Sequence, residues 1–110
     1  METYNREEAI RCFGDEEIFQ AAVGAFLEKI DEMLESARPP VEQRSFDAVK
    51  EKAHWIKGGL VYLHATPSAD AARQLEVAAD EEKGEALLPA YENLLSEVER
   101  LKKSLSSAAV

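Results

Sequence analysis

The sequence has little cysteine, little positive charge and no long apolar run, and each shortage excludes a class of protein. Cys12 is the only cysteine, so neither an intramolecular disulfide nor a cysteine-based zinc cage can form, which fits a reducing compartment. We expect this side chain to serve in packing. Thirteen Lys and Arg face 22 Asp and Glu, for a formal charge of -9, which would repel a phosphate backbone. Nucleic acid is therefore not an expected partner.

Apolar segments long enough for a membrane are also missing. No run approaches the roughly 20 residues needed to span a bilayer, and the acidic, polar N-terminal segment lacks the basic and apolar regions of a signal peptide. We expect no membrane association and a cytoplasmic protein. With 110 residues, the chain has room for one hydrophobic core. We therefore expect a single domain over residues 1–110, with its core over about 5–105.

What the sequence does contain is a series of helix start and stop signals. Asn5, with Glu8 three residues later, fits a capping pair for a short helix over residues 6–13, which Gly14 would end. Asp15 can cap a second helix of about twenty residues. Its apolar residues recur at helical spacing: Ile18, Phe19, Ala22, Val23, Phe26, Ile30, Met33 and Leu34.

Two adjacent prolines, Pro39 and Pro40, predict the end of this second helix and a loop over residues 37–44. Neither proline can donate a backbone hydrogen bond, and the second restricts the residue before it. Ser45 is then a candidate N-cap for a third helix. One narrow apolar stripe on that helix is expected to face the core: Phe46, Val49, Ala53, Ile56, Leu60 and Leu63.

Two more helices follow. Thr66 and Pro67 predict a cap and a first-turn proline for the fourth helix, and Gly84 interrupts the chain before the last one. The fourth helix has a thin apolar face with small residues, which permits close packing: Ala72, Leu75 and Ala79. The last helix has a heptad-like stripe: Leu87, Tyr91, Leu94, Val98, Leu101 and Leu105.

One apolar face on each of four long helices, with short connections, predicts an all-α protein: an antiparallel four-helix bundle with a short N-terminal helix. A coiled-coil dimer through the last helix is the alternative. It leaves the stripes of the other three helices without a partner, so we expect the bundle and a monomer.

His54, Lys57 and Gly58 are the residues that suggest chemistry. At about 100° per residue, His54 and Gly58 point away from the core stripe of their helix, and Lys57 lies at its edge. A neutral imidazole has a free ring nitrogen that can attack phosphorus. Lysine one turn away can neutralise phosphoryl charge, and the Gly58-Gly59 pair, unfavourable inside a helix, would leave room for a partner. A solvated surface and a packing glycine are the ordinary alternatives.

Other residues complete the candidate site. Glu76 lies at the edge of the neighbouring helix's apolar face and is the best candidate to orient the His54 ring. Val61 and Lys50, on the same helix as His54, are expected docking residues. Trp55 and Tyr62 are expected to form a packing groove for another helix, and a partner-binding patch is the alternative.

His64 is expected to be structural. It lies near a helix end, where a partly charged imidazole is favoured, and ten residues, or about 15 Å of helix, from His54. This separation excludes a zinc site formed by the two histidines, and a metal hydrolase finds no ligand cluster in the sequence.

Residues 53–58, Ala-His-Trp-Ile-Lys-Gly, resemble the His-x-x-Lys-Gly motif of histidine-containing phosphotransfer (HPt) domains, and the likeness extends from about residue 13 to residue 101. Leu75 and Glu76 are similar to a Leu-Glu or Leu-Gln pair of that family. The resemblance implies that His54 accepts a phosphoryl group and that Glu76 bonds the second ring nitrogen. The expected partners are receiver domains of response regulators or hybrid sensor kinases.

The same resemblance leaves a second donor open, the separate catalytic domain of a chemotaxis-type kinase. The sequence has no glycine-rich phosphate loop, so we expect no ATP-binding site and no enzyme activity of its own. We also expect no cofactor, because the magnesium would belong to the partner receiver. A helical scaffold or adaptor without phosphotransfer is the competing interpretation.

Overall fold

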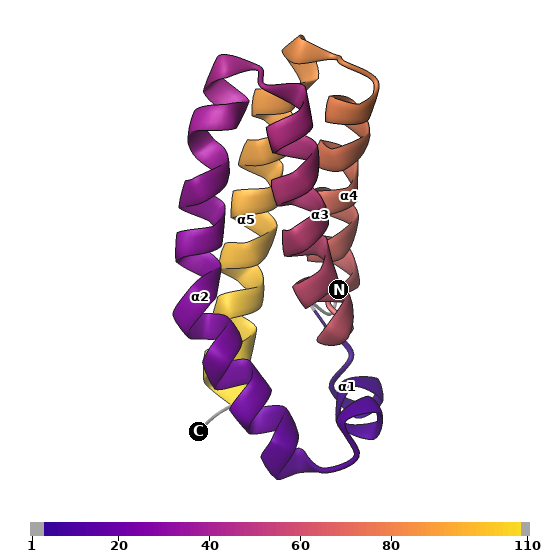
Figure 1. The fold of residues 1–110 in the computed structure, drawn as a ribbon. Helices are drawn as coiled ribbons and strands as arrows, with labels where there is room; N and C mark the ends of the chain where they lie inside the picture. Colours follow the sequence, from indigo (N-terminus) through magenta and orange to yellow (C-terminus); the bar gives the residue numbers. More distant parts are fainter. Residues whose placement is uncertain (1–3, 109–110) are drawn as a thin grey trace.

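The computed structural model describes residues 4–108, with side chains described as far as residue 105. These residues form five helices and contain no strand, so the predicted all-α class is confirmed. In Figure 1, the four long helices lie side by side and the short first helix lies at one end of them. The helices are α1 (Arg6–Phe13), α2 (Glu16–Gln43), α3 (Phe46–Tyr62), α4 (Thr66–Asp80) and α5 (Gly84–Ala108).

The first two helix starts and the first stop follow the local rules. The side chain of Asn5 accepts a hydrogen bond from the backbone N–H of Glu8 at 3.1 Å. Gly14 ends α1 in the left-handed region, with φ 85°, and its N–H bonds back to Ile10. Asp15 then caps α2 by accepting from the backbone N–H of Glu17 at 2.6 Å. The caps at Asn5, Gly14 and Asp15 are thus confirmed. The reciprocal half of the predicted pair is absent, because the backbone N–H of Asn5 donates to the carbonyl of His64.

The predicted end of the second helix at the two prolines is wrong, as is the loop over residues 37–44. Helix α2 continues through Pro39 and Pro40 to Gln43 and ends at Arg44, which has φ 53°. Each interior proline costs about 3 kcal/mol. However, Ala37 and Val41 on the inner side of this segment are buried, and burying a valine contributes about 1.5 to 3 kcal/mol. Burial of Val41 and Ala37 therefore offsets part of the combined penalty of about 6 kcal/mol for the two prolines.

The starts of α3 and α4 depart in part from prediction. Ser45 is the N-cap residue of α3, but its side chain makes no capping hydrogen bond. Thr66 does not cap α4: it is the first helical residue, and the N-cap is Ala65, while Pro67 lies in the first turn as predicted. Ala65 is fully buried, so packing fixes the entry of the chain into α4 where a hydroxyl cap was expected. Helix α5 begins at Gly84.

The core lies between the four long helices, where α3 packs against α4, α4 against α5, and α2 against both α3 and α5. Ile18, which was placed on the core stripe of α2, is about half exposed. No helix within residues 4–108 combines the length and the apolar character that a membrane crossing would require. The largest fully buried side chains are Tyr91, Phe19, Ile30, Ile56, Leu60, Leu75, Leu87, Leu94, Leu101, Leu105, Val49 and Val98.

Candidate functional site

His54 lies in the middle of α3 and points out of the protein. Its neighbours Ala53 and Ile56 are fully buried in the core, which fixes the rotation of the helix about its axis. The His54 side chain is 70% exposed. Because the apolar side of α3 is buried in the core, the His54 imidazole on the other side of the helix is exposed to solvent, as the apolar stripe predicted.

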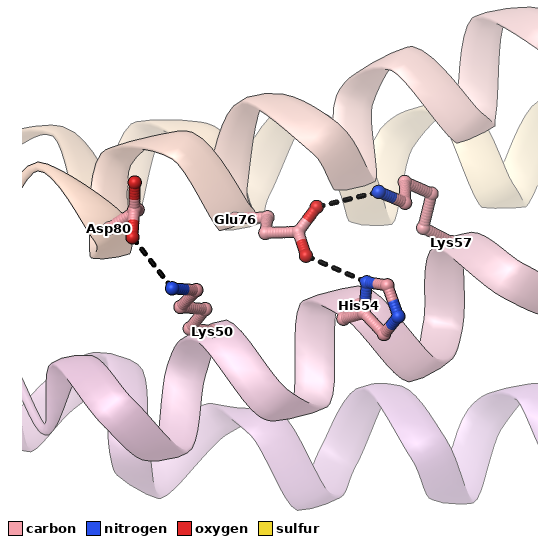
Figure 2. Close-up of polar contacts among 5 residues, drawn as sticks. All are labelled: Lys50, His54, Lys57, Glu76 and Asp80. Carbon is pink, nitrogen blue, oxygen red and sulfur yellow. Dashed lines mark hydrogen bonds and ion pairs between the residues drawn. The ribbon is translucent and has the colours of Figure 1, made fainter.

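Glu76 on α4 connects the two candidate residues of α3. One carboxylate oxygen, Oε2, lies 2.8 Å from His54 Nδ1, and the other, Oε1, accepts a hydrogen bond from Lys57 Nζ at 2.7 Å. Figure 2 shows this arrangement, with the Glu76 side chain reaching from α4 to both residues of α3. The predicted contact between Glu76 and His54 is present. The contact between Glu76 and Lys57 was not anticipated.

The ionisation state of Glu76 determines which nitrogen of the His54 ring carries the proton. Burial alone would raise the pKa of the Glu76 carboxyl, but hydrogen bonds from Lys57 and His54 lower it below its ordinary value. The carboxylate is therefore ionised near neutral pH and can only accept hydrogen bonds. We assign the imidazole proton to His54 Nδ1 on this basis. The Nε2 lone pair is then free, on the side of the ring away from Glu76 in Figure 2.

Lys57 lies one turn after His54 but is less exposed than a solvated lysine. Its side chain is 25% exposed and that of Glu76 is 16% exposed, so this ion pair lies at the edge of the core. An ammonium group there provides a positive charge close to the ring. In this structure it neutralises the carboxylate, and the four-carbon stem of lysine permits it to reorient.

The expected docking residues lie along the same outer part of α3. Gly58 is exposed, and a Cβ added there would meet no atom within 4 Å. Val61 is 56% exposed. Lys50 donates a hydrogen bond to Asp80 of α4 at 2.6 Å, and this bond raises the pKa of the Lys50 amine. Asp80 was not identified from sequence, although it lies four residues after Glu76 as Lys50 lies four before His54.

Two aromatic residues of α3 contradict their predicted role. Trp55 and Tyr62 were expected to form a packing groove for another helix of the bundle, but they are 56% and 72% exposed. Tyr62 instead lines a hollow, together with Gly59, which has no side chain to fill it, and the partly buried Phe26 and Met33 of α2. Both aromatic side chains therefore remain on the exposed surface of the helix that carries His54.

Cys12 and His64 form a separate contact at one end of the bundle. Cys12 is exposed, so its predicted packing role is wrong, and its Sγ lies 3.1 Å from His64 Nε2. His64 has φ 53°, and its carbonyl accepts a hydrogen bond from the N–H of Asn5 at 2.9 Å. His64 therefore ties α1 and the segment before it to the turn between α3 and α4. This agrees with the structural role expected for it.

Comparison with known families assigns most of the chain. Residues 21–105 match the family described as the Hpt domain, a range that includes His54, Lys57 and Glu76. No curated protein and no solved structure gives a significant match. The match covers more than half of the 110 residues and agrees with the helical fold and the exposed histidine. The chain belongs to the Hpt domain family, whose members carry out histidine phosphotransfer with receiver domains in phosphorelays.

Proposed function

We propose that this chain is a phosphoryl carrier in which His54 accepts a phosphoryl group from a receiver-domain aspartate and passes it to a second receiver. The observation that carries the proposal is the 2.8 Å contact of His54 Nδ1 with an ionised carboxylate of Glu76. This contact leaves Nε2 as the free, exposed nucleophile. The four long helices, taken as an antiparallel bundle, provide the rigid support for this ring.

The transfer step uses Nε2 as nucleophile and the donor carboxylate as leaving group. The Nε2 lone pair forms the N–P bond while the bond between phosphorus and the aspartate oxygen breaks, and the freed aspartate keeps that electron pair. The Nδ1 proton stays between His54 and Glu76, whose negative charge stabilises the positive imidazole ring that results. Onward transfer to a second aspartate reverses these changes.

Lys57 is proposed to favour the phosphorylated state. Before transfer its ammonium group neutralises Glu76 at 2.7 Å. After transfer the added phosphoryl oxygens provide a stronger negative partner one helical turn away, and the flexible side chain can turn toward them. Lys57 would thus bring positive charge to the site without a metal ion in this domain.

The receiver is proposed to dock over the outer side of α3. Gly58 would leave space for the partner backbone, Val61 would contribute apolar contact area, and Lys50 would lie at the rim. The magnesium of the reaction would belong to the partner receiver, and the protein is proposed to act as a monomer without an ATP site of its own. The separate catalytic domain of a chemotaxis-type kinase is the alternative donor.

A helical scaffold without phosphotransfer is the competing function, and one substitution separates the two. We expect a phosphorylated receiver to label the parent protein, and His54→Gln to abolish labelling without loss of helical content by circular dichroism. His64→Gln is the matched control and should keep labelling. A His54→Gln protein that is labelled as strongly as the parent would refute the assignment.

A further inference from the structure

A groove runs along the outer side of α2 and α3, and its lining includes Trp55, the residue after His54. Two hollows form it, and they adjoin because Lys29 and Met33 line both. One end is apolar, with Phe26, Gly59 and Tyr62 in its lining. We call this surface the α2–α3 groove.

The other end of the α2–α3 groove carries positive charge. Lys29, Lys52 and Trp55 line it, and the Lys52 ammonium lies 5.8 Å from the centre of the Trp55 ring. Among the described residues, no ion pair uses Lys29 or Lys52. Glu32 also lines this end, so two lysines face one carboxylate. This is a local excess of positive charge on a protein of formal charge -9.

The opposite side of His54 has the opposite sign. A hollow between α3 and α4 is lined by His54 itself with Asp47, Glu51, Glu76 and Lys50. The Lys50 amine is already paired with a carboxylate of α4 at 2.6 Å. Glu76 is itself paired with Lys57, whereas Asp47 and Glu51 form no ion pair among the described residues. The lining of this hollow therefore has an excess of negative charge.

We propose that the α2–α3 groove selects the receiver, by taking a docking segment that has an apolar ridge flanked by carboxylates, with the carboxylates over Lys29 and Lys52. This inference rests on the proposed function, because it names the chemistry of the partner for the same site. Trp55 and Tyr62 belong both to the exposed outer part of α3 and to the groove. A partner that covers both His54 and the adjacent Trp55 would therefore reach the groove.

Charge complementarity favours this occupant over the others. A second copy of the chain would bring -9 against -9, and a purely apolar segment would cover two ammonium groups without pairing them, which is costly. Carboxylates placed over the lysines satisfy that charge. The same carboxylates are repelled by the acidic side, so only one orientation of the partner is favourable.

The experiment compares two double variants with equal changes of charge. The first is Lys29→Glu with Lys52→Glu. The control is Arg73→Glu with Lys103→Glu, because Arg73 lines a hollow between α4 and α5 and Lys103 is an exposed residue of α5. Receiver domains of the source organism, phosphorylated with acetyl phosphate and Mg²⁺, serve as donors. Initial rates of His54 labelling are measured at low salt and at about 0.5 M salt, where charges are screened within about 4 Å.

At low salt we expect the groove variant to accept phosphoryl groups from the fastest receiver on the order of tenfold more slowly than the control variant. The difference should shrink at high salt, and reversing the facing carboxylates of that receiver to lysine should restore the rate. Phosphoramidate, a small phosphoryl donor that needs no docking, should label all three proteins equally.

Three results would overturn the inference. The first is a groove variant that is labelled as fast as the control variant at low salt. The second is loss of phosphoramidate labelling in the groove variant, which would assign the two lysines to the reactivity of His54 itself. The third is that receivers without such carboxylates are the fastest donors. Failure of the proposed function looks different. In that case no receiver labels the parent protein at all.

Discussion

Replacing Gly58 with alanine should make the free protein more stable and phosphoryl transfer slower. Gly58 lies inside α3, and a methyl group there would meet no atom within 4 Å. Alanine is better than glycine in a helix interior by about 0.5 to 1 kcal/mol. One kcal/mol shifts the unfolding temperature of a domain of about this size by about 4 to 8 °C. We therefore expect a rise of roughly 2 to 8 °C.

Transfer should respond in the opposite direction. In-line attack needs the reacting atoms within about 3 to 3.5 Å, and a misplacement of about 1 Å can cost on the order of a hundredfold in rate. A side chain one turn from His54, between the ring and the docked receiver, would cause such a misplacement. We expect Gly58→Ala to slow receiver-dependent labelling mildly and Gly58→Gln to slow it severely, with both variants still helical by circular dichroism.

Gly24 provides the matched control for this pair of measurements. It is also an exposed glycine inside a helix, α2, with no atom within 4 Å of an added Cβ. It is absent from the lining of the α2–α3 groove. Gly24→Ala should raise the unfolding temperature as much as Gly58→Ala and leave transfer unchanged. If Gly58→Gln is labelled as fast as the parent, the receiver does not cover Gly58 and the proposed docking surface is wrong.

Two further substitutions test the polar contacts of the site. Lys57→Ala removes the 2.7 Å hydrogen bond to Glu76 and should lower the free energy of unfolding by about 1 kcal/mol, while shortening the lifetime of phosphorylated His54. An unchanged lifetime in a label-decay assay would leave Lys57 with a structural role only. Glu76→Gln should be less stable than the parent at neutral pH by about 1 kcal/mol in urea unfolding. The folded pKa of Glu76 lies below its ordinary 4.5, so this difference should be full above that pH and disappear as the pH falls through the lowered value. A difference independent of pH would contradict this account.

The helices and the candidate site could be predicted from sequence because both depend on spacing within one segment. Asn5, Gly14 and Asp15 act on backbone groups no more than four residues away, so local rules were sufficient for them. The stripe through Ala53 and Ile56 determined which side of α3 is buried, and hence that His54 is exposed. Glu76 was placed beside His54 because α4 also has an apolar stripe. When the stripes of α3 and α4 both face one core, each helix has little freedom to rotate about its own axis.

Only the tertiary structure decided the features whose energy depends on distant residues. Helix α2 continues through Pro39 and Pro40, and Val41 in the same segment is buried against the rest of the core. A rule based on the local effect of proline does not include the contribution of that burial. Lys57 is paired with Glu76 because a neighbouring helix places a carboxylate within its reach. In each case the contribution of a residue depends on the surface it meets, and that surface is supplied by parts of the chain that become neighbours only when the helices pack.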